Sequence, residues 1–375
     1  MSKNSRLVAR AMNQLPDLNQ LEQHLRDDPI AAAAPALQPS GGSHGGMFEL
    51  MRSSRGSIEG TFETINTEET LELNKPEAEE VLEAGTRAVT KINEEGENAE
   101  LTLDEQTGLE AIILVFGRPA ILIQNGTFAA APQGWEILEA RRQIIESTFP
   151  SVGRIEEKKM LQGGMIGTGF LVADDVIMTN RHVARFFSIE GLSNNWKLKL
   201  GMNPIIDYVE EEAAASSAEF RITEVVGIHE TLDLALLRVE KNSQISPGLT
   251  QPKPLSIASS EPDLSEVRKV YVVGYPATDN GGVTPPEVIL RLFSSIFQVK
   301  RLQPGEIQAV FDEKPIMAHD CSTLGGNSGS AVFDLETGQV IGLHFRGEFR
   351  KQNHAVALWK LADDPLLKKA KVNFV

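Results

Sequence analysis

The stretch 320–329, which reads Asp-Cys-Ser-Thr-Leu-Gly-Gly-Asn-Ser-Gly, holds the residues whose types and spacing best fit nucleophilic chemistry. A serine between glycines on a tight turn can stand clear of the backbone, and Gly325 and Gly326 can take backbone angles closed to other residues. We expect the N–H groups of Gly326 and Ser328 to converge on the oxygen that becomes negative when a carbonyl is attacked. Ser328 is therefore the candidate nucleophile. Taken by itself, a hairpin loop rich in Gly, Ser and Asn explains the same residues equally well.

Two other stretches offer the base and the orienting group that a serine nucleophile needs. Residues 167–184 read as two β-rich runs joined by a short polar turn, with His182 just past the second run. Residues 231–239 read as an apolar strand interrupted by a single carboxylate, Asp233. A buried Asp is costly without a partner, and His182 is the partner that we expect.

The order His182, Asp233, Ser328, with the local patterns Thr-Asn-Arg-His-Val-Ala, Asp-Leu-Ala-Leu-Leu and Gly-Asn-Ser-Gly-Ser, resembles the serine peptidases of the trypsin/chymotrypsin fold. Among the bacterial members, the Deg/HtrA type and the glutamyl endopeptidases are most similar. The resemblance covers about residues 150–350. It implies a mainly β fold of two six-stranded antiparallel β-barrels, with His and Asp in the first and Ser in the second. It also implies a serine endopeptidase that uses this triad, with Gly326 and Ser328 as the oxyanion hole.

The same resemblance implies a substrate pocket. The residue six before the nucleophile lies at the pocket base in this family, where an Asp selects Lys or Arg; here it is Ser322, which disfavours trypsin-like cleavage. The strand 340–347 forms the pocket wall and includes His344 and Gly347. His344 aligns with the histidine that glutamyl endopeptidases use to bind a carboxylate, and Thr323 aligns with their threonine. A protonated or hydrogen-bonded imidazole there favours cleavage after Glu. The alternative is that His344 is a strand histidine satisfied by its neighbours.

The remaining histidines receive no catalytic role. His24 and His44 fall in the N-terminal part, His229 and His354 read as surface positions, and His319 is expected to brace the nucleophile loop. No pair has the spacing of metal ligands, so we expect neither a metal nor a cofactor.

Composition limits the possible partners and the compartment. The formal charge of −16 over 375 residues argues against a general affinity for nucleic acid or for an anionic membrane. A single cysteine, Cys321, forms no intrachain disulfide, which favours a reducing compartment. Residues 1–30 carry charges throughout and show no apolar core of signal-peptide length. We therefore expect a cytoplasmic protein whose partner is a protein or peptide substrate.

The N-terminal part differs in pattern from the rest and predicts three regions. Residues 1–60 read as a flexible segment with one possible helix and a linker, 61–148 as a mostly helical region, and 149–375 as the peptidase domain. Within the helical region we expect helices at 76–95, from a capping box at 102–105, and at 135–148, with a strand at 120–124. Residues 1–148 are either a helical cap or a sensor or adaptor that binds a regulatory protein.

Three further expectations concern control and alternatives. Trypsin-like zymogens carry an Asp before the nucleophile, whereas this chain has Asn327, so activation by a buried terminal amine is not implied. The loop 278–286 is expected to border the cleft, and residues 359–372 to form a closing helix. A non-catalytic binding module on the same fold is the competing class. A quality-control protease is the third, although only 25 residues follow Arg350, too few for the expected peptide-binding domain.

Overall fold

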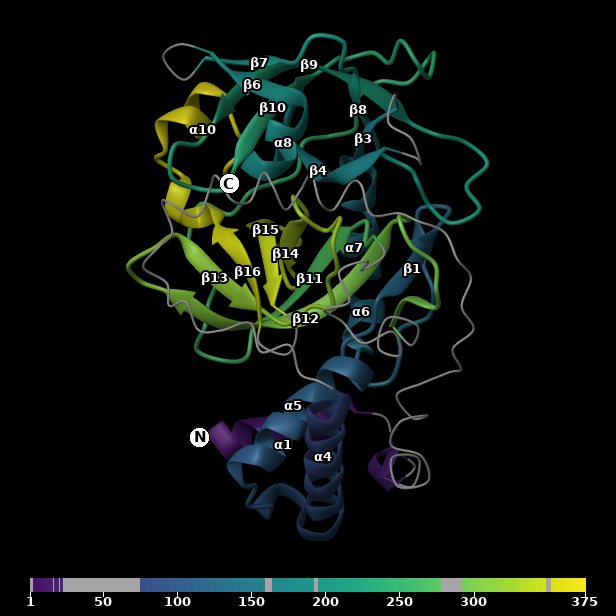
Figure 1. Cartoon of the computed structure of the whole chain (residues 1–375), viewed down its shortest axis with the longest axis vertical. Coiled ribbons are helices and arrows are strands. Elements are labelled where there is room, and N and C mark those ends of the chain that lie inside the picture. The colour runs from purple at the N-terminus through teal and green to yellow at the C-terminus, as the bar shows by residue number, and fades with distance from the viewer. Residues whose placement is uncertain are drawn as a thin grey trace. The chain divides into compact units, whose positions relative to one another are not determined.

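The computed structural model describes residues 3–15, 17–19, 21–22, 75–158, 164–191, 195–277, 292–348 and 352–375. The predicted linker and the loop 278–286 lie outside these residues. The chain divides into two compact units: 1–119 with 131–137 and 279–295, and 120–130 with 138–278 and 296–375 (Figure 1). In the described part, no helix is both long and apolar enough to cross a membrane.

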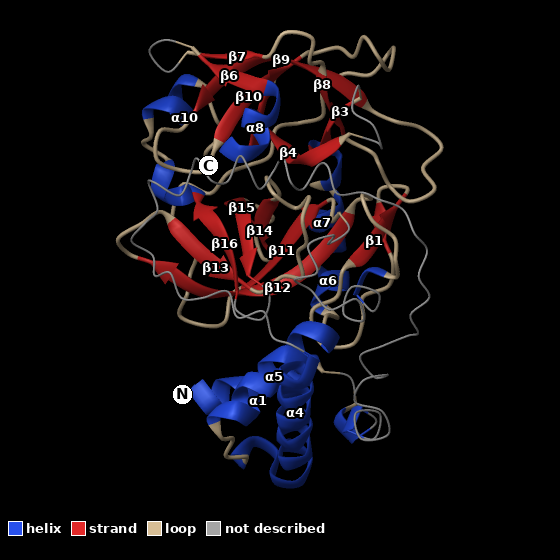
Figure 2. Ribbon diagram, viewed as in Figure 1, coloured by secondary structure: helices blue, strands red, loops and turns tan. Residues whose placement is uncertain are grey.

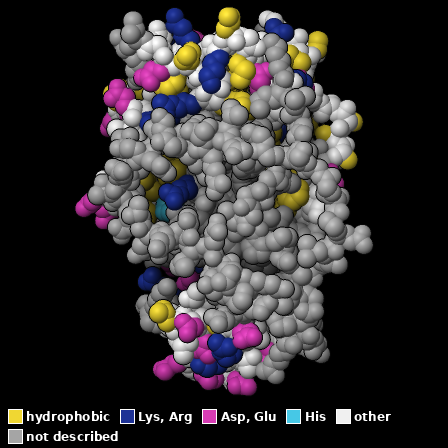
Figure 3. Space-filling view, viewed as in Figure 1, with side chains coloured by type: hydrophobic (Ala, Val, Ile, Leu, Met, Phe, Trp, Pro, Cys, Tyr) yellow, Lys and Arg dark blue, Asp and Glu magenta, His cyan; other side chains and the backbone are white. Residues whose placement is uncertain are grey.

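The first unit is a small helical bundle of α1 (Lys3–Gln14), α4 (Lys75–Glu95) and α5 (Leu103–Phe116), with a short 3-10 turn, η2 (Gly96–Asn98), after α4. The predicted capping box is confirmed, because Thr102 and Glu105 exchange hydrogen bonds at the start of α5. All three helices contribute to one core, which includes Leu7, Val8, Ala11, Ala88, Val89, Ile92, Leu109, Ile112 and Ile113. The predicted N-terminal helix thus packs with the other two. Figure 3 shows acidic and basic side chains interspersed over these helices.

A β-hairpin and two short helices lead into the second unit. β1 (Ile121–Gln124) and β2 (Thr127–Phe128) flank Asn125-Gly126, where both residues have positive φ, as this turn requires. The helix predicted at 135–148 is wrong: α6 (Ile137–Ala140) ends where Arg141 N–H bonds back three residues to Leu138, and α7 (Arg142–Glu146) starts anew. The second unit therefore includes residues ahead of the boundary predicted at 149.

The first barrel is a closed ring of six antiparallel strands in the order β10-β5-β4-β3-β8-β9 (Figure 2). Its strands are β3 (Val152–Glu157), β4 (Met165–Ala173), β5 (Val176–Thr179), β8 (Pro204–Asp207), β9 (Glu219–Ile228) and β10 (Ala235–Val239). Helix α8 (Arg181–Phe187) follows β5, and a small hairpin of β6 (Ser188–Glu190) and β7 (Trp196–Leu198) follows α8. β4 and β5 are buried over almost their whole length.

The second barrel has strand order β11-β14-β15-β16-β13-β12, and a further pairing of β11 with β12 closes the ring. Its strands are β11 (Lys269–Gly274), β12 (Arg301–Phe311), β13 (Ile316–His319), β14 (Ala331–Asp334), β15 (Val340–Glu348) and β16 (Gln352–Ala357). The predicted pair of six-stranded barrels is confirmed. β1 also pairs with β12, so the hairpin extends the second sheet. The single closing helix is wrong: η5 (Leu358–Leu361) ends before Asp364, which caps a separate helix, α10 (Pro365–Lys369).

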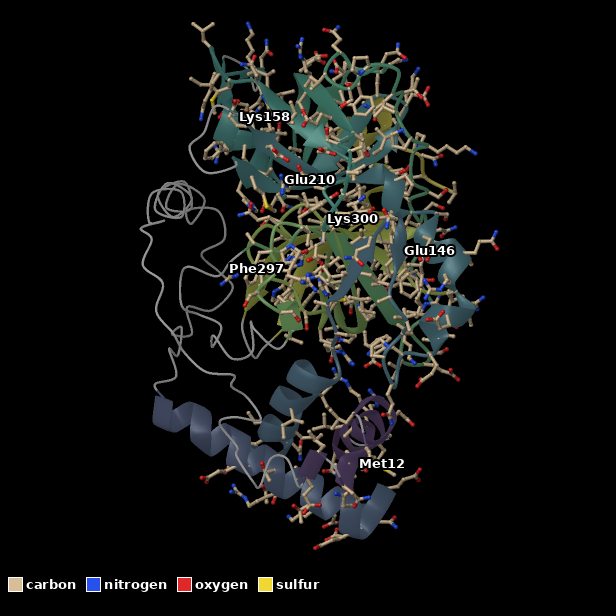
Figure 4. The ribbon with its side chains drawn as sticks, turned by 90° about the vertical axis from the view of Figure 1, so that its right-hand side faces the viewer. Met12, Glu146, Lys158, Glu210, Phe297 and Lys300 are labelled. Carbon is tan, nitrogen blue, oxygen red and sulfur yellow. The ribbon has the colours of Figure 1, made fainter. Side chains whose placement is uncertain are left out.

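Buried charges join the two barrels of this unit (Figure 4). The Lys300 ammonium is buried and donates to the carbonyls of Phe149 and Tyr208 at 2.8 and 2.6 Å, and burial lowers its pKa to about 8. Arg154 on β3 pairs with Glu210 at 2.8 Å and donates to the carbonyl of residue 298 at 2.7 Å. Burial also raises the pKa of Glu210 to about 7. Residues 298–300, which lead into β12, are therefore bound to the first barrel.

Candidate active site

His182 lies in the first turn of α8, directly after the strand β5. Its ring Nδ1 is 2.7 Å from Asp233 Oδ2, and its backbone N–H donates to Asp233 Oδ1 at 3.0 Å. Burial opposes ionisation of Asp233, but the charge and hydrogen bonds of His182, together with the charge of Arg181, outweigh it, so the pKa of Asp233 is lowered. An ionised carboxylate only accepts hydrogen bonds, so Nδ1 carries the ring proton and Nε2 can accept one. The predicted pairing of His182 with Asp233 is confirmed.

The loop that carries Ser328 is held by the first barrel. Gly326 and Gly329 both have φ of +89°, and a Cβ on Gly326 would lie 2.5 Å from the carbonyl oxygen of Tyr275. Thr168 on β4 donates its backbone N–H to the Ser328 carbonyl at 2.9 Å and its hydroxyl to the Gly326 carbonyl at 2.8 Å. These two bonds hold the carbonyls of Gly326 and Ser328, on either side of Asn327. They keep the loop in a backbone conformation that differs from an ordinary hairpin turn.

The two backbone donors predicted for the oxyanion hole, at Gly326 and Ser328, lie in this loop. Within the residues that the structure describes, the backbone N–H groups of Gly326 and Ser328 have no protein acceptor, as expected of an oxyanion hole. In the same residues the Ser328 hydroxyl makes no hydrogen bond to the His182 ring. The fold nevertheless brings their neighbourhoods together at Gly167, where a Cβ would lie 2.8 Å from Val183 and 3.0 Å from the Ser328 carbonyl oxygen.

The predicted pocket residues Thr323 and Gly347 meet at a residue that the sequence did not identify. The Asn353 side chain donates to the Cys321 carbonyl at 2.6 Å, so its Oδ1 faces Thr323 and accepts the hydroxyl at 2.8 Å. A Cβ on Gly347 would lie 2.5 Å from that same Oδ1, so a side chain at this position would displace the Asn353 amide. No local motif could reveal Asn353, because its contact with Thr323 spans 30 residues and depends on strand pairing. For Ser322, the carbonyl accepts a hydrogen bond from Gln303.

His344 and His319 form a buried hydrogen-bond chain. The backbone N–H of Cys321 donates to His319 Nδ1 at 3.3 Å, and His319 Nε2 lies 3.1 Å from His344 Nδ1. Burial, followed by neighbouring histidines, lowers the pKa of His344 to about 3, and burial lowers the pKa of His319 well below its usual value. Both rings are therefore neutral. Since His319 Nδ1 accepts, its Nε2 donates to His344 Nδ1, and the His344 proton must sit on Nε2.

Two histidines predicted at the surface are partly buried. His229 has a side-chain exposure of 15% and contacts Asp364. The His354 ring lies near the rings of Phe311 and Phe345, with centroid distances of 6.2 and 6.4 Å. His319 does brace the nucleophile loop as predicted, through the N–H of Cys321.

In the described part of the chain, no group of three or more His, Cys, Asp or Glu side chains is arranged to hold a metal ion. The site is built from one imidazole, one carboxylate, one hydroxyl and free backbone donors. Such a set can carry out acyl transfer by proton exchange and charge stabilisation within the protein's own groups.

Comparison with known proteins agrees with this geometry. Residues 167–343 match the trypsin-like peptidase domain. A glutamyl endopeptidase of Staphylococcus epidermidis is 30% identical over 194 residues, which cover 52% of this chain and 58% of the relative. The serine protease Rv3671c of Mycobacterium tuberculosis is 28% identical over 268 residues, 70% of this chain and 56% of the relative. The chain thus spans little more than half the length of these relatives.

Solved structures include the active form of the Rv3671c protease, which has a TM-score of 0.41 and 22% sequence identity, and the alignment covers 63% of this chain and 87% of that one. The sequence match falls on the two barrels, with His182, Asp233 and Ser328 all inside it. Residues 167–343 therefore belong to a trypsin-like peptidase domain.

Proposed function

We propose that this chain is a serine endopeptidase that hydrolyses peptide bonds through Ser328, His182 and Asp233. The observation that carries the proposal is the two-point hydrogen bond between His182 and Asp233, because it fixes the ring tautomer in which Nε2 can accept a proton. The supporting comparison is the match of this region to the trypsin-like peptidase domain.

In the proposed mechanism, Ser328 Oγ attacks the carbonyl carbon of the substrate while His182 Nε2 takes the hydroxyl proton. The carbonyl oxygen becomes negative and accepts hydrogen bonds from the N–H groups of Gly326 and Ser328, each worth about 10²- to 10³-fold in rate. The imidazolium, stabilised by Asp233, then gives its proton to the leaving amine. Water repeats the sequence on the acyl-enzyme and frees Ser328.

A fluorophosphonate probe tests this proposal directly. We expect one covalent adduct, located on Ser328 by mass spectrometry of tryptic peptides, and turnover of a peptide library by the same protein. Ser328→Ala is the control and should lose both the adduct and the turnover while melting like the wild type. A folded wild type that neither takes the label nor cleaves any peptide would contradict the proposal.

A non-catalytic binding module is the second candidate. The observation that favours it is the absence of a hydrogen bond between the Ser328 hydroxyl and the His182 ring in the described residues. This alternative predicts peptide binding without turnover, and equal binding by wild type and Ser328→Ala. The labelling experiment separates the two, since catalytic hydrogen bonds are often long before substrate arrives.

We further propose a preference for Glu before the cleaved bond, read by a neutral His344. The ring carries its proton on Nε2, and in the described residues that nitrogen has no protein acceptor. Thr323 cannot share this task in the present arrangement, because its hydroxyl proton already points at Asn353. A neutral N–H group can also donate to the side-chain carbonyl of Gln, so discrimination between Glu and Gln should be modest, about tenfold.

Matched peptides that differ only in Glu, Gln or Ala before the cleaved bond test this preference. We expect kcat/KM in the order Glu, Gln, Ala, and a His344→Leu variant should cleave all three at similar rates. Equal rates for wild type on Glu and Ala would remove the proposed preference and leave the endopeptidase assignment intact.

Regulation by the N-terminal helices and a cytoplasmic location complete the proposal. The support for regulation is that the helical unit has its own core. The support for location is the single cysteine, which is buried. Turnover by the full chain should differ from turnover by a truncation starting at residue 120, which keeps the hairpin on the second sheet. Identical kinetics for both would end the regulatory idea, and cell fractionation tests the location.

A further inference from the structure

The carboxylate of Asp233 depends on the turn that carries it. Both oxygens accept hydrogen bonds from His182, and within the described residues no other group donates to them. The main chain around it is held instead: Asn180 donates its side-chain amide to the Asp233 carbonyl at 2.9 Å, and Arg181 donates to the carbonyl of His229. Any shift of the turn therefore moves the carboxylate relative to the His182 ring.

The turn 229–234 folds around the imidazole of His229. The backbone N–H of His229 donates to the Leu234 carbonyl at 2.9 Å, which closes the turn. Inside it, His229 Nδ1 accepts the N–H groups of Thr231 and Leu232 at 3.2 and 3.1 Å. A ring nitrogen that accepts carries no proton, so Nε2 of a neutral ring must carry it. The ring thus replaces the strand partners that these two amides lack.

The C-terminal helix holds that ring from outside the barrel. His229 Nε2 lies 3.3 Å from Asp364 Oδ2, and both side chains are 15% exposed. The other oxygen, Asp364 Oδ1, accepts the N–H groups of Leu366 and Leu367 and caps α10. Leu366 packs onto β9, where a Cβ on Gly227 would lie 2.5 Å from its methyl carbon. α10 is therefore anchored both to the barrel wall and to His229.

We propose that His229, held by Asp364, is a positioning residue that sets the place of Asp233 in the proposed triad. This inference rests on the proposed function, because it assigns His229 an effect on a proton-transfer step. It also makes the C-terminal helix part of the catalytic arrangement, although α10 contributes no group that reaches substrate. The effect should fall on kcat and leave KM nearly unchanged, since the substrate pocket lies in the second barrel.

Four variants of the full chain test the proposal. His229→Ala removes the acceptor and should lower kcat about 10- to 100-fold with KM within about twofold. His229→Asn keeps an acceptor near the place of Nδ1 and should recover most of that loss. Asp364→Asn keeps the cap of α10 but no longer accepts from the ring, and should lower kcat less than His229→Ala. Asp363→Asn, on the exposed neighbour that pairs with Lys368, is the matched control and should change nothing.

A spectroscopic readout separates this inference from the proposed function. The His182 Nδ1 proton shared with Asp233 should give a far-downfield proton NMR resonance that is missing in His182→Ala. We expect His229→Ala to weaken or abolish it in a protein that still melts cooperatively, whether or not the wild type turns over substrate. An unchanged resonance in a folded His229→Ala, or a kcat within twofold of wild type, overturns the inference. If His229→Ala does not fold, the same two measurements on His229→Asn and Asp364→Asn decide: an unchanged Asp364→Asn overturns it.

Discussion

Two histidines of the peptidase domain use the same ring atom, Nδ1, for opposite purposes. In the first barrel, His182 Nδ1 faces the carboxylate of Asp233, which can only accept, so Nδ1 carries the proton and Nε2 is bare. In the second barrel, His344 Nδ1 faces a donor, His319, so Nδ1 is bare and Nε2 carries the proton. His182 can therefore take a proton, and His344 can donate a hydrogen bond. The partner of Nδ1, not the residue type, determines which of the two a histidine does.

The largest expected effect comes from reversing the partner in the first barrel. In Asp233→Asn, the backbone N–H of His182 keeps the side-chain oxygen, so the amide NH₂ turns toward the ring and forces the proton to Nε2. His182 then has the donor tautomer of His344 and cannot act as base. We expect kcat/KM to fall about 10³- to 10⁴-fold with the pocket preference unchanged. Steady-state kinetics on the Glu peptide measure it, and a fall of less than tenfold would show that Asp233 does not set the tautomer.

This first contrast also shows what the sequence could predict. The short patterns around His182, Asp233 and Ser328, through the family that they resemble, predicted the double barrel and the His–Asp pair. The strand expected over 231–239 begins only at Ala235, so Asp233 lies in the turn before β10 and does not interrupt the strand. The fixed turn geometry at Gly326 was likewise readable from glycine placement, and its φ of +89° agrees.

Long-range pairing accounts for what the sequence did not predict. The acceptor that Thr323 uses, Asn353, and the bond between His319 and His344 depend on the registers of β13, β15 and β16, which no local spacing encodes. A strand was expected at 120–124 and β1 lies at 121–124, but its partner β12 is about 180 residues away. His229 was assigned to the surface because nothing nearby shows that α10 returns to cover it.

The next effect concerns stability at acid pH. The folded-state pKa of His344 is about 3, whereas an exposed histidine in the unfolded chain titrates near 6.5. Between about pH 3 and pH 6.5, His344 binds a proton in the unfolded state but not in the folded state. The free energy of unfolding is therefore highest above about pH 6.5 and decreases as pH falls through this range. Relative to His344→Gln, wild type should lose about 1–3 kcal/mol of unfolding free energy between pH 7 and pH 4.

Urea denaturation of both proteins at each pH measures this difference. The comparison between variants is needed because Glu210 acts in the opposite direction: its raised pKa of about 7 makes the fold more stable as pH falls through that value. Glu210→Gln in both backgrounds is the control, and the histidine effect should persist there. A gap between wild type and His344→Gln that stays constant with pH would mean that His344 takes up its proton at the same pH in the folded and unfolded states.

A smaller effect follows from removing the donor to His344. In His319→Leu, Nδ1 of His344 loses its partner, so the ring can place its proton on either nitrogen and the donor at Nε2 is no longer fixed. The ratio of kcat/KM for Glu over Ala peptides should fall about tenfold, while the Ala rate stays near wild type. His319→Gln can still donate an amide N–H and is the matched variant that should restore the ratio. If both variants keep the wild-type ratio, the tautomer of His344 does not depend on His319.

The smallest expected effect is the change of the Glu over Ala ratio with pH. It is the most discriminating test, because pH should affect the function of His182 and leave that of His344 unchanged. Activity as a whole needs the neutral form of the base His182, since a protonated ring cannot take the Ser328 proton. The Glu over Ala ratio should stay within about twofold from pH 5 to pH 9, because His344 has a pKa of about 3 and is neutral throughout that range. An imidazolium in the pocket would instead lose its selectivity as pH rises past the usual histidine value near 6.5. Competition between the two peptides in one reaction measures the ratio directly, and the factor for His182 cancels because both peptides use the same base. If the Glu over Ala ratio declines steeply above about pH 6, His344 is charged at lower pH, and the contrast between the His182 and His344 rings does not hold.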